Sequence, residues 1–236
     1  MQNKRYPHAQ AAHTHHDDLG NIMNTDAQVA LGSDVASVMK NTYLLLGMTI
    51  AFSAAIAYLS MGMPHPGFLV VLVGFYGLFF LTAKLRDSVW GIVSTFALTG
   101  FMGYTLGPII GMFAGAGAMP VVANALGLTA FVFFGLSAYA LISRKDFSFL
   151  AGFITAGFFV LIGAMVIGFF TQMPGLQLAI SAGFVLFSSA AILYQTGEII
   201  HGGERNYIMA TISLYVSIYN LFLSLLHLLS AFSGND

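Results

Sequence analysis

The chain has 236 residues, of which 58% are hydrophobic and only 7% are charged, and its mean hydropathy is +0.83. Soluble domains carry about 25% charged residues, so this composition excludes a soluble globular protein and indicates a helical membrane protein. The net charge of −1, without a basic cluster, excludes electrostatic binding of nucleic acid, and the absence of cysteine excludes disulfides, thiolate metal sites and a cysteine nucleophile.

The first 37 residues are polar and show little periodicity. They predict a mobile tail (residues 1–37), followed by one transmembrane domain over residues 38–236. A run of histidine and aspartate at residues 13–18 carries side chains that can bind a transition metal. The tail offers no ordered scaffold to fix their geometry, so neither a metal nor another cofactor is predicted.

Seven apolar stretches follow the tail, separated by short polar breaks. Each has roughly 17 to 25 residues, the range that spans the ~30 Å hydrocarbon core of a bilayer at about 1.5 Å per residue, and the second stretch is the shortest. The sequence therefore predicts an all-α bundle of seven transmembrane helices. The predicted spans are approximately residues 41–61, 67–83, 89–113, 121–142, 149–171, 175–199 and 207–231.

The basic residues occupy only the segment before the first span and every second break after it. They are Lys4, Arg5, Lys40, Lys84, Arg86, Arg144, Lys145 and Arg205. Lysine and arginine concentrate on the cytoplasmic side of membrane proteins. The pattern therefore predicts a cytoplasmic N-terminus and, after seven crossings, a C-terminus on the outer side, which is the periplasm in a bacterium.

The third stretch combines a glycine repeat with a proline. Gly103, Gly107 and Gly111 recur every four residues and form one smooth stripe, against which a neighbouring helix can pack closely. Pro108 removes one helical hydrogen bond and predicts a kink. We interpret the stripe as a packing surface; a hinge, or opened backbone that lines a cavity, is the alternative.

Polar residues recur on one face of each of the last two stretches. In the seventh, at intervals of 4, 3, 4 and 3 residues, they are Ser213, Ser217, Asn220, Ser224 and His227. In the sixth, they are Ser181, Ser188 and Gln195, with Glu198 one turn further on. Polar side chains within a membrane face the protein interior or water, so the two stripes are expected to face each other or a shared cavity. The candidate polar cavity comprises Gln195, Glu198, Ser213, Ser217 and Asn220, and interhelical hydrogen bonding alone is the alternative.

Glu198 is the one acidic residue within an apolar stretch, and His201 follows three residues later on the same predicted helical face. Together they are a candidate pH-sensitive pair, with a solvated helix end as the alternative. A di-iron site would require further inward carboxylates. An intramembrane hydrolase would require a histidine metal triad or a Ser-His-Asp set at one depth. His65 and His227 are predicted toward the outer side and His201 toward the inner, so no enzyme is predicted.

Several segments resemble the Bax inhibitor-1 family of seven-span membrane proteins, and most closely its bacterial branch. They are ATISLYVSIYNLFLSLLHLL at residues 210–229, IIHGGERNYI at 199–208 and TGFMGYTLGPIIG at 99–111. Further segments, such as NTYLLLGMTIAFSA and SAYALISRKDFSFLAG, extend the resemblance over approximately residues 40–230. It covers nearly the whole predicted bundle but not the tail.

The resemblance implies a multi-pass protein of the bacterial inner membrane, in contact with lipid, that binds the ATP-dependent membrane protease FtsH and limits its activity. The tail would give that protease a segment to grip. The alternative is a pH-sensitive leak for calcium or another ion, because calcium-leak members of the family carry one aspartate in span 6 and one in span 7. Gln195 and Ser217 stand at those positions here, and two neutral side chains supply neither the charge nor the proton switch.

Overall fold

The computed structural model describes the backbone of residues 8–171 and 173–234, and the side chains of these ranges from Asp34 onward. All regular secondary structure in these ranges is helical. The elements are α1 (His8–Leu59), α2 (Phe68–Leu85), α3 (Val89–Gly115), α4 (Met119–Ser143), α5 (Leu150–Thr171), α6 (Pro174–Ile200) and α7 (Tyr207–Ser233). All seven are long and apolar enough to cross a membrane, α1 over Asp34–Leu59. The predicted seven-helix membrane bundle is confirmed.

The predicted spans agree with the helices to within a few residues, except at the start of α1. This helix begins at His8 and runs through the boundary expected at residue 38. Over the residues whose side chains are described, the part of α1 that could cross a membrane is Asp34–Leu59. The histidine and aspartate side chains at residues 13–18 lie outside the described residues. The mobility of the tail stays a prediction.

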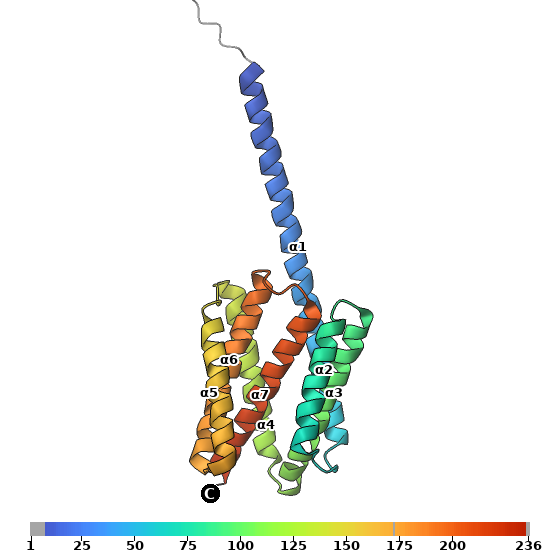
Figure 1. Ribbon diagram of the computed structural model, residues 1–236, viewed down its shortest axis with the longest axis vertical. Helices are drawn as coiled ribbons and strands as arrows, with labels where there is room; N and C mark the ends of the chain where they lie inside the picture. The colour runs from blue at the N-terminus through green and yellow to red at the C-terminus, as the bar shows by residue number, and fades with distance from the viewer. Residues whose placement is uncertain (1–7, 172, 235–236) are drawn as a thin grey trace, which may run out of the picture.

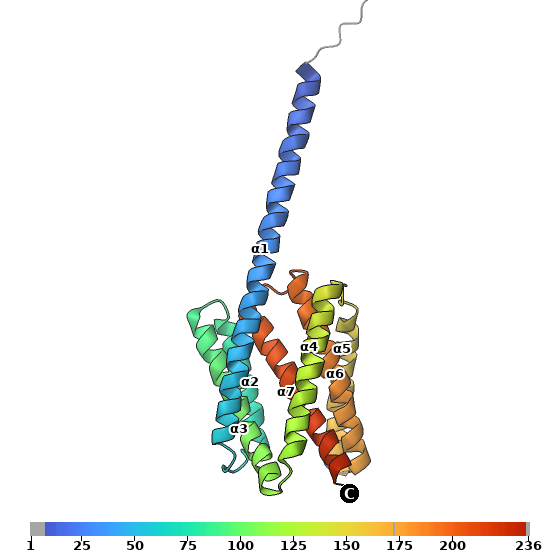
Figure 2. The same ribbon diagram turned by 180° about the vertical axis from the view of Figure 1, so that it is seen from behind.

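Helix α7 lies at the centre of the bundle and crosses it diagonally (Figure 1). It packs against α1, α3, α4 and α6, whereas α2 packs mainly on α3 and α5 mainly on α6. Seen from behind, α1 and α4 cover the other side of α7 (Figure 2). The core is accordingly richest in α7 side chains, and Ile212, Leu214 and Leu221 are all fully buried. Helices α2 and α5 are the two least buried spans and form the outer walls.

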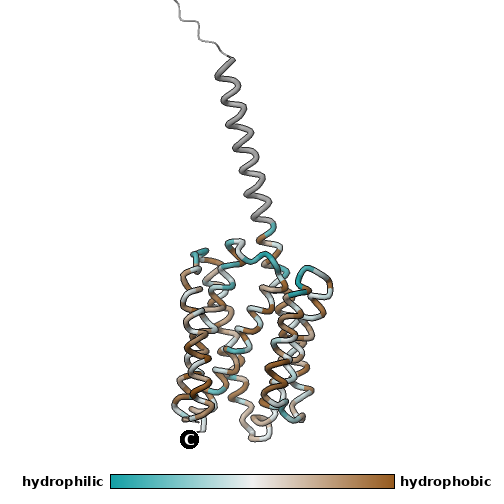
Figure 3. Tube along the Cα trace, in the orientation of Figure 1, coloured by the Kyte–Doolittle hydropathy of each residue, from teal (hydrophilic) through white to brown (hydrophobic). Residues whose placement is uncertain are grey.

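Hydrophobic residues dominate the middle of the spans, and hydrophilic residues gather in the loops at the ends of the bundle (Figure 3). The loops that join α2 to α3, α4 to α5, and α6 to α7 lie at the end where α1 enters the bundle (Figure 1). Arg86, Arg144, Lys145 and Arg205 lie in these loops, and Lys84 lies in the last turn of α2 at the same end. The C-terminal end of α7 lies at the opposite end (Figure 1).

Cysteine labelling tests the predicted orientation, and the cysteine-free chain needs no background substitution. His65→Cys lies in the exposed α1–α2 loop and Lys145→Cys in the exposed α4–α5 loop, at the other end of the bundle. We expect a membrane-impermeant maleimide added to intact spheroplasts to label His65→Cys and to spare Lys145→Cys until the membrane is opened. Labelling of Lys145→Cys from outside would contradict the predicted topology.

The glycine stripe of α3 lies directly against α1. A Cβ atom on Gly103 would meet the carbonyl oxygen of Ser53, and one on Gly107 would meet Ala57 and Ser60. A Cβ atom on Gly111 would meet the carbonyl oxygen of Met61, in the turn after α1. The two helices therefore approach more closely than any side chain at these three positions would allow.

Pro108 lies inside α3, which continues to Gly115 without interruption. A proline nitrogen cannot donate, so the carbonyl of Tyr104, four residues earlier, loses its helical partner. The hydroxyl of Ser60, the residue after α1, lies 3.4 Å from that carbonyl oxygen. Ser60 thus contacts both Gly107 and the carbonyl that Pro108 leaves open.

Candidate functional site: a polar groove between α2 and α5

A cavity of about 440 Å³, here called the membrane groove, lies between the outer walls α2 and α5, with α3, α6 and α7 completing it. Its aromatic lining comprises Phe75, Tyr76, Phe79, Phe101, Phe158, Phe184, Phe187 and Tyr219. Its polar lining comprises Thr105, Ser188, Gln195, Ser213, Ser217 and Asn220. The groove therefore combines apolar aromatic walls with hydrogen-bonding groups from α3, α6 and α7.

A second cavity of about 280 Å³, here called the mouth, adjoins the membrane groove toward the α6–α7 loop. Its lining comprises Ile154, Ala191, Tyr194, Gln195, Glu198, Gly203, Glu204, Ala210 and Ser213. Four of these residues also line the groove: Ile154, Ala191, Gln195 and Ser213. The two cavities therefore follow one path, from the middle of the bundle to the loop end.

The structure brings all five residues of the candidate polar cavity to these two hollows. Gln195 and Ser213 line both of them, Ser217 and Asn220 line the groove, and Glu198 lines the mouth. The two polar stripes meet here, because the Gln195 amide nitrogen donates to the Ser217 hydroxyl at 3.2 Å. That hydroxyl lies 2.9 Å from the carbonyl oxygen of Ser213.

The stripes also meet near the C-terminal end of α7, where the Ser181 hydroxyl lies 2.7 Å from Nδ1 of His227. Ser188, between these two contacts on α6, differs from its neighbours. It is 1% exposed, and its hydroxyl has no hydrogen-bond partner among the described residues. A buried hydroxyl without a partner is costly, and this one belongs to the groove lining.

Tyrosines of α7 extend the polar contacts toward α3 and α1. The hydroxyl of Tyr219 lies 2.9 Å from that of Thr105. The hydroxyl of Tyr215 lies 2.5 Å from that of Ser53 and donates to the Thr99 carbonyl at 3.3 Å. These contacts could not be predicted from the sequence, because single hydroxyls on separate helices form no pattern along one chain segment.

At the mouth, the end of α6 folds back on itself. The backbone amides of Gly203 and Glu204 donate to the carbonyl of Glu198 at 2.8 and 3.2 Å. The Glu198 carboxylate lies so close to Gly203 that a Cβ atom there would collide with it. Glu204 accepts a hydrogen bond from the backbone amide of Asn206 at 2.8 Å. Two carboxylates therefore lie in the lining of one small cavity.

His201 lies on the other side of this loop. Helix α6 ends at Ile200, and His201 is its C-cap, with its backbone amide donating to the Gly197 carbonyl at 3.0 Å. Its Nδ1 is 2.9 Å from the carbonyl oxygen of Gly197, and its Nε2 is 3.2 Å from that of Arg144 in the α4–α5 loop. Glu198 and His201 line different cavities, so the pH-sensitive pair stays a prediction.

The α4–α5 loop that His201 contacts has its own turn. The backbone amide of Ser148 donates to the Asp146 carboxylate at 2.8 Å. Hydrogen bonds from the Ser148 backbone and side chain lower the pKa of the Asp146 carboxyl, with a smaller effect from nearby His201. Asp146 lies at the loop end of the bundle but outside the linings of the groove and the mouth.

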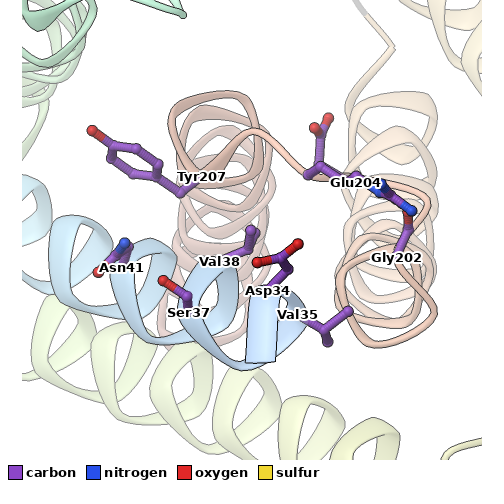
Figure 4. A pocket seen from close by; sticks show the side chains of 9 residues that line it. Asp34, Val35, Ser37, Val38, Asn41, Gly202, Glu204 and Tyr207 are labelled. Carbon is purple, nitrogen blue, oxygen red and sulfur yellow. The ribbon is translucent and has the colours of Figure 1, made fainter. Parts of the chain in front are cut away.

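A third cavity, of about 310 Å³, lies between α1 and the α6–α7 loop (Figure 4). Asp34, Ser37 and Asn41 contribute from α1, and Glu204 and Tyr207 lie on the facing segment (Figure 4). Its remaining lining residues are Val35, Val38, Gly202 and Arg205. Glu204 belongs to this cavity and to the mouth, so it stands in the wall between them.

Residues 35–234 match the family described as inhibitor of apoptosis-promoting Bax1, which is the Bax inhibitor-1 family. The chain belongs to this family. The predicted resemblance is confirmed over almost the whole described bundle.

Three relatives illustrate the similarity to other members of the Bax inhibitor-1 family. An uncharacterized protein of Pseudomonas aeruginosa is 65% identical over 214 residues, which cover 89% of this chain and 96% of the relative. The protein named modulator of FtsH protease YccA, of Escherichia coli K12, is 55% identical over 201 residues, or 84% of this chain and 91% of the relative. The protein named inner membrane protein YccA, of E. coli O6:H1, matches equally well. The chain is a multi-pass inner-membrane protein.

Within this Bax inhibitor-1 fold, the described residues include no group of three His, Cys, Asp or Glu side chains that could hold a metal ion. The three histidines from His65 onward contact different parts of the bundle. His65 Nδ1 lies 2.6 Å from the carbonyl oxygen of Pro66 in the α1–α2 loop, His201 contacts the α4–α5 loop, and His227 contacts Ser181. Their arrangement offers no shared site for hydrolytic chemistry.

Proposed function

We propose that the chain is an inner-membrane regulatory protein, not an enzyme, that binds the ATP-dependent membrane protease FtsH and limits its activity. The observation that carries this proposal is the 55% identity, over 84% of the chain, to the E. coli protein named modulator of FtsH protease YccA. Identity at this level over 84% of the chain supports a shared partner as well as a shared fold.

The geometry of the polar groove is consistent with a regulatory role. The facing positions on α6 and α7 hold a neutral pair, Gln195 and Ser217, which are hydrogen-bonded to each other. A neutral amide and a hydroxyl offer a divalent cation few of the charged oxygen ligands that it prefers. Binding of a membrane partner, by contrast, requires no charge at this depth.

In the proposed orientation, the N-terminal segment and the basic loops face the cytoplasm, where the tail provides a handle for the protease. We expect deletion of residues 2–36 to leave the bundle inserted and folded, because the tail is polar and adds little to a buried core. We expect the same deletion to reduce the FtsH recovered with the protein from membranes in mild detergent. A matched control replaces residues 2–36 with a glycine-serine linker of equal length.

Co-purification of FtsH with the full chain tests the proposed partner, and repeating it with the two purified proteins tests direct contact. Absence of FtsH from the full-length sample would refute the partner. A truncated protein that inserts normally and competes for FtsH as well as the full chain does would refute the role of the tail alone.

A second candidate function is an ion leak through the polar groove. One observation favours it: the residues at the positions of the family's acidic pair, Gln195 and Ser217, do lie in contact and line the cavity. In this case the groove would keep the geometry of the family's calcium pathway but would lack the two carboxylates of the acidic pair. Calcium flux into liposomes distinguishes the two functions.

A further inference from the structure

The two ends of the path formed by the groove and the mouth differ in chemistry. The groove end has aromatic walls on several helices, and the mouth end carries Glu198 and Glu204. The described lining of both cavities contains no lysine, arginine or histidine. Arg205, the residue after Glu204, lines the third cavity, and its Nε donates to the Gly202 carbonyl at 3.2 Å. A hollow that is apolar at one end and negative at the other matches a molecule that is apolar at one end and positive at the other.

The electrostatics of the mouth favour a cation more than the two side chains alone would. Glu198 lies in the last turn of α6, where the helix dipole already contributes negative potential. Tyr194 belongs to the same lining, and ammonium groups are attracted to aromatic rings. A bound cation would offset the repulsion between the carboxylates and the helix end.

A second, independent observation points to an occupant of the groove. Ser188 is 1% exposed, its hydroxyl has no partner among the described residues, and it belongs to the groove lining. The groove volume of about 440 Å³ lies within the range of roughly 300–1,000 Å³ for small-molecule sites. The aromatic walls suit an alkyl or aromatic tail, and the polar lining leaves this hydroxyl to be satisfied.

We infer that the groove and the mouth together form a binding site for a small cationic amphiphile, an ammonium-type head with an apolar tail. The head lies at Glu198 and Glu204, and the tail lies among the aromatic side chains between α2 and α5. Because α2 and α5 are the outermost and least buried spans, such a molecule reaches the site from the bilayer. This site is independent of the proposed protease partner.

The test uses the full-length protein in nanodiscs of zwitterionic phosphatidylcholine, titrated with dodecyltrimethylammonium in a calorimeter. Empty nanodiscs give the partition background. Laurate and dodecanol are the matched probes, since they keep the alkyl chain and reverse or remove the head charge. We expect saturable binding of the ammonium probe, and binding of the other two weaker by roughly tenfold or more, because a charge-assisted contact is lost.

Variants place the probe in the site. Glu198→Gln keeps the shape of the side chain and removes its charge, and should weaken ammonium binding by roughly tenfold. Glu204→Gln tests the same loss of charge if the first variant fails to fold. Ser188→Ala tests whether the groove contributes to binding of the probe. Asp146→Asn is the control, because it removes a carboxylate at the same end of the bundle but outside both linings.

The outcomes are distinct. Saturable binding that prefers the ammonium probe and falls in the Glu198 or Glu204 variant, but not in the Asp146 variant, supports the site. Linear partition equal to that of empty nanodiscs, equal binding of laurate, or no change in either glutamate variant overturns it. None of these results alters recovery of FtsH, so failure here is distinguishable from failure of the proposed function.

Discussion

Leucine in place of Gly107 will force α3 away from α1 and lower the free energy of unfolding by about 3 kcal/mol, the upper part of the usual range for overpacking. At Gly107 even a Cβ atom would collide with backbone of α1 around Ala57 and with the Ser60 hydroxyl. Backbone cannot rotate aside as a flexible side chain can. The substitution would also move Ser60 away from the Tyr104 carbonyl that Pro108 leaves open.

The measurement is the thermal unfolding of the purified variants in mild detergent. Gly127→Leu is the matched control, since Gly127 is also inside a transmembrane helix but has nothing within 4 Å of a Cβ position. We expect the control to melt close to the wild type and Gly107→Leu to melt well below it. Equal melting of the two variants would show that the α1–α3 contact contributes little to stability.

Restoring two carboxylates at the facing positions of α6 and α7 should convert a silent groove into a pH-dependent calcium leak. In the wild type, Gln195 and Ser217 are in contact, so Gln195→Asp with Ser217→Asp places two acidic groups within reach of each other. Two carboxylates this close titrate as a coupled pair and can share a proton. The deprotonated pair offers a divalent cation charged oxygen ligands that the wild type lacks.

Calcium flux into liposomes over a range of pH provides the measurement. The control is Gln195→Asn with Ser217→Asn, which changes the same two side chains without adding charge. We expect little flux from the wild type and the neutral control, and more from the acidic double variant as pH rises. Robust pH-dependent flux in the wild type would favour the leak function and direct attention to Glu198.

The spans could be predicted because the membrane imposes a length, and loops such as that of Arg144 and Lys145 interrupt the apolar sequence where it ends. The contact between the polar stripes could also be predicted from the sequence, since Gln195 and Ser217 each belong to a row of polar residues with helical spacing. The exact ends of helices were harder to predict. Helix α6 ends at Ile200, and hydrophobicity alone does not show whether His201 belongs to the helix.

The aromatic walls of the groove could not be predicted. Side chains that face lipid are as apolar as those that face the core, so helices such as α2 and α5 carry no one-sided pattern that identifies their neighbours. Phe79 and Phe158 become part of one cavity only through the arrangement of five helices. The glycine stripe of α3 indicated a close neighbour, but nothing in its spacing identified that neighbour as α1.

Helix α2 is the shortest of the seven, and its 18 residues extend over only about 27 Å. This is less than the ~30 Å hydrocarbon layer, a negative hydrophobic mismatch. The surrounding lipid must thin beside α2, or Lys84 in its last turn must extend its ammonium group to the headgroups. Because α2 is one wall of the membrane groove, a change in bilayer thickness that tilts α2 would change the width of that groove.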